Sequence, residues 1–112
     1  MVPDNKAGDN RTRAAFRALA DRVRNGAGKA SAEQRARAFA DEGLDPPLRT
    51  LISKVATSAA DVTDADFAAA KASGCSEDQL FELVVCAAVG QSARLYEAGL
   101  AALAEASAQR EA

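Results

Sequence analysis

The chain of 112 residues has no histidine, no tryptophan, one tyrosine and only two cysteines. Because histidine is absent, no side chain has an unperturbed pKa near neutrality, and the usual proton relay of acid–base enzymes is missing. The two cysteines lie eleven residues apart, which is not a disulfide framework, and we expect no disulfide between Cys75 and Cys86. These absences favour a binding or structural protein over an enzyme.

Long hydrophobic runs are also missing. No apolar segment reaches the roughly 18 residues of a membrane-spanning helix, and the first ten residues lack the apolar centre of a signal peptide. We therefore expect a cytoplasmic protein with no membrane partner. The acidic segment that begins at Asp61 lacks the glycine and the glutamate of a calcium loop, since Asp66 and Ala72 occupy those positions. Neither a metal site nor a cofactor is predicted.

The charge balance gives no sign of a nucleic-acid partner. Residues 1–50 carry ten basic and seven acidic side chains, a sum of +3, and residues 51–112 carry four and nine, a sum of −5. No aromatic residues alternate with the basic ones, and no recognition motif is present. Contact between oppositely charged parts of two copies explains this asymmetry at least as well, and we expect no nucleic-acid partner.

Hydrophobic residues make up 48% of the chain, but 29 of all residues are alanine. Few large side chains remain to build a core, and a small domain buries a smaller fraction of its surface than a large one. We expect residues 1–10 to be a disordered lead-in and residues 11–106 to form a single helical domain. The thin core predicts a symmetric oligomer whose subunits share their hydrophobic residues.

The segment from Ser76 to about Ala104 is the longest periodic stretch of the chain. Ser76 and Gln79 form a capping box, and two acidic residues follow in the first turn, where the helix dipole favours them. Between Leu80 and Val89 only one residue is charged, so this part of the helix is apolar on nearly all sides. One small protomer cannot bury such a helix alone. The chain is therefore expected to self-associate through the helix of residues 76–104.

Two apolar rows follow the length of this helix. The first is Leu80, Leu83, Val84, Ala87, Ala88, Leu95, Ala98, Ala102 and Leu103, and the second is Phe81, Val85, Val89, Tyr96 and Leu100. The small residues Gly90, Ser92, Ala93 and Gly99 would let another backbone come close. A continuous helix of about 28 residues is expected, with a kink at Gly90 as the alternative.

Four shorter helices are predicted before it. They run from Asn10 or Thr12 to about Arg24, from Ser31 to about Glu42, from Asp45 to about Ala59, and from Thr63 to Gly74. Their expected inward residues are Phe16, Leu19, Ala20 and Val23, then Ala36, Phe39 and Ala40, then Leu48, Leu51, Ile52, Val55 and Ala59. The fold class is therefore an all-α, compact bundle of about five helices with a long C-terminal helix.

Residues 46–104 resemble the carboxymuconolactone decarboxylase family, which includes the alkylhydroperoxidase D-like proteins. The resemblance lies in PPLRTLISKVA, in VTDADFAAAKASG and in CSEDQLFELVVCAAVGQSARLYEAGLAAL. It implies an alkylhydroperoxidase D-like helical protomer that assembles into trimers or hexamers around the long helix. Peroxidase-type members use a Cys-x-x-Cys, a histidine and an upstream glutamate, but the matching positions here hold Ala59, Val62, Asp66 and Thr50. No catalytic residue of the family carries over.

Two weak candidate sites remain. Cys75 precedes a helix N-terminus, which favours a thiolate, while the following Glu77 and Asp78 oppose it. It is either a one-cysteine redox centre or a structural loop residue, and Cys86 is expected to be an inert core residue.

The other candidate is the polar cluster of Arg94, Tyr96 and Glu97. Arg94 and Glu97 are spaced for an ion pair at a subunit boundary, and Tyr96 is expected in the core with its hydroxyl satisfied. The alternative is a ligand pocket between subunits in which Arg94 holds the carboxylate of a small acid.

The sequence thus favours a catalytically degenerate family member that acts as a homo-oligomeric binding or assembly subunit. The alternative is an enzyme, either an antioxidant thiol peroxidase that uses Cys75 or a decarboxylase-like enzyme acting on a small carboxylic acid or lactone.

Overall fold

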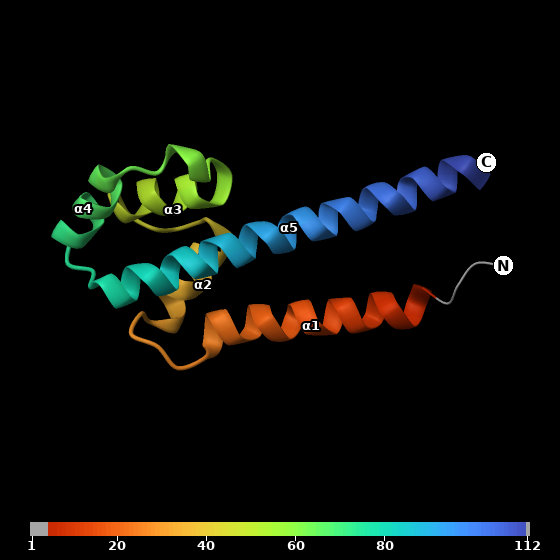
Figure 1. Cartoon of the computed structure of the whole chain (residues 1–112), viewed down its shortest axis with the longest axis horizontal. Coiled ribbons are helices and arrows are strands. Elements are labelled where there is room, and N and C mark those ends of the chain that lie inside the picture. Colours follow the sequence, from red (N-terminus) through yellow and green to blue (C-terminus); the bar gives the residue numbers. More distant parts are fainter. Residues whose placement is uncertain (1–4, 112) are drawn as a thin grey trace.

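A computed structural model describes residues 5–111, in which helices account for all regular structure (Figure 1). The elements are α1 (Asn5–Asn25), α2 (Ala32–Ala40), α3 (Leu48–Thr57), the short 3-10 helix η1 (Ala59–Asp61), α4 (Asp64–Ala72) and α5 (Glu77–Glu111). The predicted all-α bundle of five helices with a long C-terminal helix is confirmed. The alkylhydroperoxidase D-like character of that bundle stays a prediction.

Helix α5 is the axis of the molecule. Helices α1, α2 and α3 all pack against it, and α4 lies beside α3 and the start of α5. The buried core lies where these helices meet, and its members are Ala30, Ala38, Leu44, Leu48, Leu51, Ile52, Ala70, Leu80, Leu83, Cys86 and Ala87. Since α1 and α5 run side by side in opposite directions and extend well past α2, α3 and α4, the molecule measures 58 × 28 × 20 Å (Figure 1).

The helix starts form as their sequences predict. Ser76 and Gln79 exchange both bonds of a capping box, with the Ser76 N–H donating to Gln79 Oε1 at 2.8 Å and the Gln79 N–H to Ser76 Oγ at 3.1 Å. Thr63 and Asp66 form a second complete box before α4. These bonds satisfy N–H groups that a helix start otherwise leaves unpaired.

The loop between α1 and α2 is fastened to α5 by one carboxylate. Glu82 accepts the backbone N–H of Lys29 at 2.7 Å and that of Ala30 at 2.6 Å. Gly28 lies against the same carboxylate, because a Cβ at that position would come within 2.7 Å of Glu82 Oε1. The charged side chain of Glu82 therefore holds the α1–α2 loop against the apolar half of α5, a contact that we call the Glu82 clamp.

Helix α2 ends against the backbone of α5. Asp41 adopts a left-handed conformation with φ of 53°, so the helix ends at Ala40 and not near Glu42 as expected. A Cβ on Gly90 would lie 1.9 Å from the carbonyl oxygen of Phe39, so only glycine allows this approach. Gly90 is thus explained by packing, and α5 continues through it without a break.

Several details differ from the sequence-based expectations. Residues 5–10, expected to be disordered, extend α1, since each residue added to a formed helix gains a backbone bond. Residues 1–4 of that predicted lead-in lie outside the described part. The long helix, expected to end near Ala104, continues to Glu111.

Two predicted inward faces are also corrected. On α2 the buried residues are Arg35 and Ala38, whereas Ala36 and Ala40 are exposed, because the helix packs on α5 at a different angle of rotation. On α3 the face of Leu48, Leu51 and Ile52 is buried as predicted, and Ala56 joins it in place of Ala59, which lies in η1. The third helix also begins later than predicted, at Leu48 and not near Asp45.

Candidate functional site

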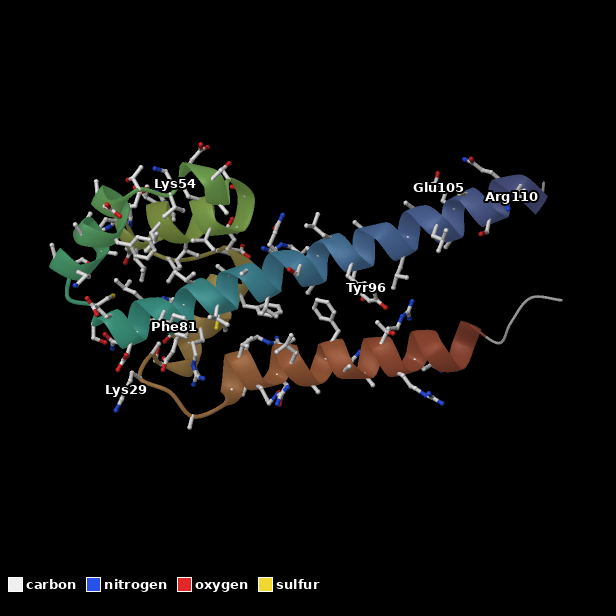
Figure 2. The ribbon with its side chains drawn as sticks, viewed as in Figure 1. Lys29, Lys54, Phe81, Tyr96, Glu105 and Arg110 are labelled. Atoms are coloured by element: carbon white, nitrogen blue, oxygen red, sulfur yellow. The ribbon has the colours of Figure 1, made fainter. Side chains whose placement is uncertain are left out.

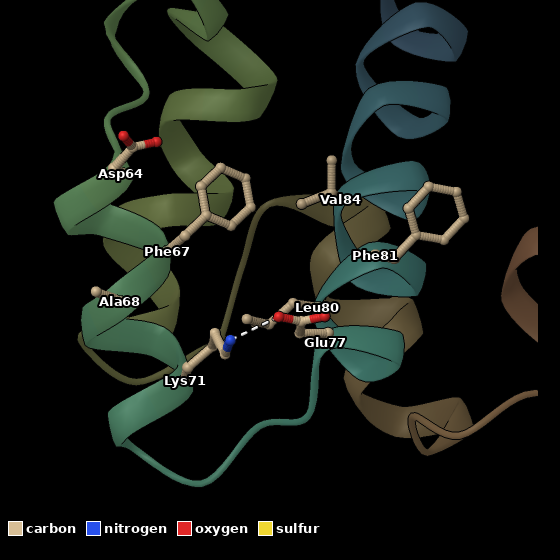
Figure 3. A pocket seen from close by; sticks show the side chains of 8 residues that line it. All are labelled: Asp64, Phe67, Ala68, Lys71, Glu77, Leu80, Phe81 and Val84. Carbon is tan, nitrogen blue, oxygen red and sulfur yellow. Dashed lines mark hydrogen bonds and ion pairs between the residues drawn. The ribbon is translucent and has the colours of Figure 1, made fainter.

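An apolar groove of about 480 Å³ lies between α4 and α5 (Figure 3). Helix α4 contributes one wall and α5 the other, and the side chains along them are Asp64, Phe67, Ala68, Lys71, Glu77, Leu80, Phe81 and Val84. At one end Lys71 Nζ pairs with Glu77 Oε1 at 2.6 Å. Apart from Asp64 and the Lys71–Glu77 pair, the lining of this α4–α5 groove is apolar, which suits contact with another apolar surface.

Phe81 stands at the edge of this groove with 70% of its surface exposed. Figure 3 shows its ring on the side of α5 turned away from α4. The periodicity of the sequence placed Phe81 in the second apolar row of a helix buried on more than one side. In the described chain Arg22 and Val23 of α1 line a cavity with Phe81 but leave most of its surface exposed.

A second cavity, of about 190 Å³, lies between α1 and α5. Tyr96 of α5 stacks on Phe16 of α1 with ring centres 5.3 Å apart and planes 12° from parallel (Figure 2). Around this pair lie the arginines of α1 and an acidic residue of α5, and the whole lining is Arg13, Phe16, Arg17, Ala20, Arg24, Phe39, Ala93, Tyr96 and Glu97. We call it the arginine cleft.

Arg24 is the most constrained side chain of the arginine cleft. Its guanidinium lies 4.6 Å from the ring centre of Phe39 and donates to the carbonyl of Ala20 at 3.3 Å. Arg13 and Arg17 are exposed, and within residues 10–110 none of the recorded ion pairs involves the three arginines. The cleft thus offers positive charge beside aromatic faces, which suits a small aromatic or aliphatic carboxylate.

Of the predicted cluster, the structure brings Tyr96 and Glu97 to this cleft but not Arg94. The guanidinium of Arg94 donates to the carbonyl of Phe39 at 2.7 Å and to Gln91 Oε1 at 3.0 Å. The expected ion pair with Glu97 is absent from the described residues, because Arg94 faces the end of α2. Arg94 satisfies a carbonyl that the helix end leaves free, a structural role.

The three arginines of the cleft are not among the candidate site residues identified from the sequence. The four-residue and seven-residue spacing of these arginines can be read from the sequence. Their neighbours Tyr96 and Glu97 could not be identified, because they lie about 80 residues further along the chain. Only the antiparallel packing of α1 on α5 brings the two sets together.

Cys75 is partly buried at the edge of the core, just before α5. It lines a cavity of about 260 Å³ together with Gln34, Arg37, Leu44, Asp45, Pro46, Leu48 and Ser73. Arg37 is engaged with Glu33 at 2.5 Å, so no free cation in this cavity is dedicated to the thiol.

Cys86 is a buried residue of the core, as the sequence predicts. Its Sγ donates to the carbonyl of Val23 at 3.1 Å, and burial raises the pKa of the thiol. A protonated, enclosed thiol is a poor nucleophile. Nine residues of helix from Glu77 separate it from the start of α5, a rise of about 14 Å, which is too far for Cys86 to resolve an oxidised Cys75 directly.

Three carboxylates have a lowered pKa, and each has a structural cause. Hydrogen bonds from the N–H groups of Ala30 and Lys29 lower the pKa of Glu82. The N–H of Thr63 and the ammonium of Lys54 lower the pKa of Asp66. The ammonium of Lys71 lowers the pKa of Glu77. All three stabilise loops or helix starts. None of the hydrogen bonds recorded for the described residues joins one of these carboxylates to a cysteine.

Comparisons with other proteins leave the family open. No protein-family model, curated protein or solved structure matches this chain. Within the described residues no group of three or more cysteine, aspartate or glutamate side chains could hold a metal ion. None of the described helices combines the length and the apolar character that crossing a membrane requires.

Proposed function

We propose that this protein is a homo-oligomeric helical subunit that assembles through α5 and serves as a binding or assembly component without catalysis. One observation carries the proposal, namely that α5 exposes large apolar side chains along its length. Phe81 is 70% exposed, Leu95 63% and Leu103 66%. Burying each fully is worth about 1.5–3 kcal/mol, and a second subunit is the simplest way to bury all three.

Light scattering tests this proposal directly. The wild-type protein is expected to have a mass of two or more chains at micromolar concentration. Leu95→Arg is expected to shift the mass to one chain, because an arginine cannot be buried unpaired in an apolar contact.

Leu19→Arg is the matched control, since Leu19 is an exposed leucine of α1, with 40% of its surface accessible. It is expected to leave the oligomer intact. A wild-type mass of one chain over the whole concentration range would refute the proposed assembly.

The binding role is proposed for the arginine cleft, with a small carboxylic acid as the ligand. Three arginines and the Phe16–Tyr96 stack supply the positive charge and the aromatic surface for this class of molecule. Benzoate is a suitable probe, and titration calorimetry is expected to show binding that Arg17→Ala weakens by roughly tenfold, the worth of one charge-assisted hydrogen bond.

Arg49→Ala is the control, because it removes the same charge from an exposed position of α3 outside the cleft. It is expected to leave benzoate affinity unchanged. Equal weakening by both variants would mean that benzoate responds only to net charge and would refute a site in the cleft.

The competing function, a thiol peroxidase, rests on the partial exposure of Cys75. Attack of its thiolate on a peroxide would give a sulfenic acid and release an alcohol or water, and a second thiol would have to reduce that sulfenic acid. Because Cys86 is buried, the second thiol would come from outside, such as dithiothreitol. We expect no catalysed peroxide consumption with this reductant, whereas turnover that Cys75→Ser abolishes would establish the enzyme.

A further inference from the structure

Eight residues of α5 form an exposed row at alternating four- and three-residue spacing, which we call the open stripe. They are Phe81, Val85, Ala88, Ser92, Leu95, Gly99, Ala102 and Ala106. Val85 is partly buried and the other seven are exposed. The row extends for about 38 Å at ~1.5 Å per residue and contains no charged side chain. A repeat of this spacing is the pattern by which one helix packs along another.

The two glycines in the middle of α5 give independent support. Gly90 is required by the chain's own packing, since a Cβ there would lie 1.9 Å from the Phe39 carbonyl. At Gly99 no described atom of the chain lies within 4 Å of a Cβ. A glycine in a helix interior costs about 1 kcal/mol relative to alanine, and nothing within the described chain offsets that cost at Gly99. Close approach of a backbone from outside the chain would do so.

Resting on the proposed assembly, we propose that the partner is a second copy of this chain, with the two α5 helices packed antiparallel about a two-fold axis near Ser92. In this register Phe81 faces the partner's Ala102, and Val85 faces the partner's Gly99. Ala88 faces the partner's Leu95, and the two copies of Ser92 face each other. Each large residue thus meets a small one. A parallel pair would place the two copies of Phe81 against each other and the two copies of Gly99 against each other. The first contact would be overpacked and the second would leave a void.

The ends of the helix fit the same arrangement. The α5 residues beyond Tyr96 extend past α2, α3 and α4, and an antiparallel partner would place this part of its own α5 along the α4–α5 groove beside Phe81 (Figures 1 and 2). The acidic first turn of Glu77 and Asp78 would lie near the partner's Arg110, the basic residue of the last turn. Opposite charges and opposed helix dipoles favour antiparallel over parallel packing.

Site-directed cross-linking tests this register in a Cys75→Ser background, where the remaining Cys86 is 1% exposed. Ser92→Cys is expected to form a disulfide-linked dimer when diamide removes two electrons and two protons from the paired thiols. The exposed but off-stripe Ala101→Cys serves as the control. The stripe variant should react roughly a hundredfold faster, because a paired thiol has an effective concentration in the millimolar range.

Two further variants distinguish antiparallel from parallel packing. In the proposed register Ala88→Cys faces the partner's residue 95, so Ala88→Cys and Leu95→Cys should cross-link rapidly when mixed but not separately. Two copies of residue 88 would lie about 11 Å apart along the helix, beyond the ~7 Å limit for a disulfide. Circular dichroism should show that each variant, changed at an exposed position, keeps its helix content.

The outcomes separate the register from the assembly itself. Rapid self-linking of Ala88→Cys alone would overturn the antiparallel register in favour of a parallel one. An oligomer seen by light scattering in which no stripe variant cross-links faster than Ala101→Cys would overturn the stripe as the contact and leave the proposed assembly standing. A monomer under all conditions would overturn both.

Discussion

The two halves of α5 share one unbroken helix but have opposite surroundings. Residues 77–96 pack on the other helices along one side, where Leu83 has no exposed surface, although Phe81 and Leu95 of the open stripe stay exposed. Residues 97–110 are exposed apart from the partly buried Leu100. Their sequence is nevertheless rich in alanine, with six alanines and two leucines among fourteen residues. The first half shows what this chain does when it packs on itself, and the second shows an alanine-rich surface that its own chain leaves open.

Substitution of the two glycines of α5 is expected to give the largest difference in unfolding free energy between these halves. Gly90→Ala is expected to lower the free energy of unfolding by about 3 kcal/mol, because the new methyl collides with the Phe39 carbonyl and α2 must move away. Gly99→Ala at concentrations where the chain is monomeric is expected to raise helix stability by up to about 1 kcal/mol. Urea denaturation measures both, and similar effects at the two positions would contradict the division of the helix.

Truncation of two leucines, one buried and one exposed, compares the same two environments of α5. Leu83→Ala is expected to cost about 3 kcal/mol of unfolding free energy, since Leu83 is fully buried and its removal leaves a cavity. Leu95→Ala is expected to change the monomer's stability by less than about 0.5 kcal/mol, because that side chain is 63% exposed. The same change should weaken association. Denaturation at two protein concentrations separates the stability of the monomer from the free energy of association. If Leu95→Ala lowered the unfolding free energy equally at both concentrations, Leu95 would have no role in assembly.

A smaller effect is expected at the Glu82 clamp. Glu82→Gln is expected to cost about 1–2 kcal/mol at pH 7, because the charged acceptor of the Lys29 and Ala30 N–H groups becomes neutral. The pKa of Glu82 is lowered in the folded chain, so its contribution is complete above the unfolded glutamate pKa of about 4.3 and is lost as the pH falls through the lower folded value.

The difference in stability between wild type and Glu82→Gln should therefore shrink below about pH 4.3. Denaturation measured at pH 7 and at successively lower pH checks this. A difference that stays constant across that range would show that the charge of Glu82 is not what fastens the loop.

The local features of the fold could be predicted from the sequence because their causes lie within a few residues. The capping pair of Ser76 and Gln79 and that of Thr63 and Asp66 each span four residues, and both form. The helix type of α5 follows equally from its periodicity. In contrast, the end of α2 was placed too late, because it depends on the left-handed Asp41 and on contact with α5.

The candidate sites were harder to predict because their partners lie far away in the sequence. Arg94 pairs with the carbonyl of Phe39, 55 residues earlier, and not with the nearby Glu97. Periodicity identified Phe81 as an apolar position of α5, but it could not tell which apolar row the other helices cover. The core and the open stripe of α5 look alike in sequence, and only the placement of the other helices separates them.

Hydrogen exchange along α5 tests the central claim most directly. If a second copy covers the open stripe, the amides of residues 97–106 should be protected at high protein concentration and lose most of that protection on dilution, while the amide of Leu83 stays protected throughout. Rapid exchange in residues 97–106 at every concentration would show that this part of the helix stays uncovered and would contradict the account.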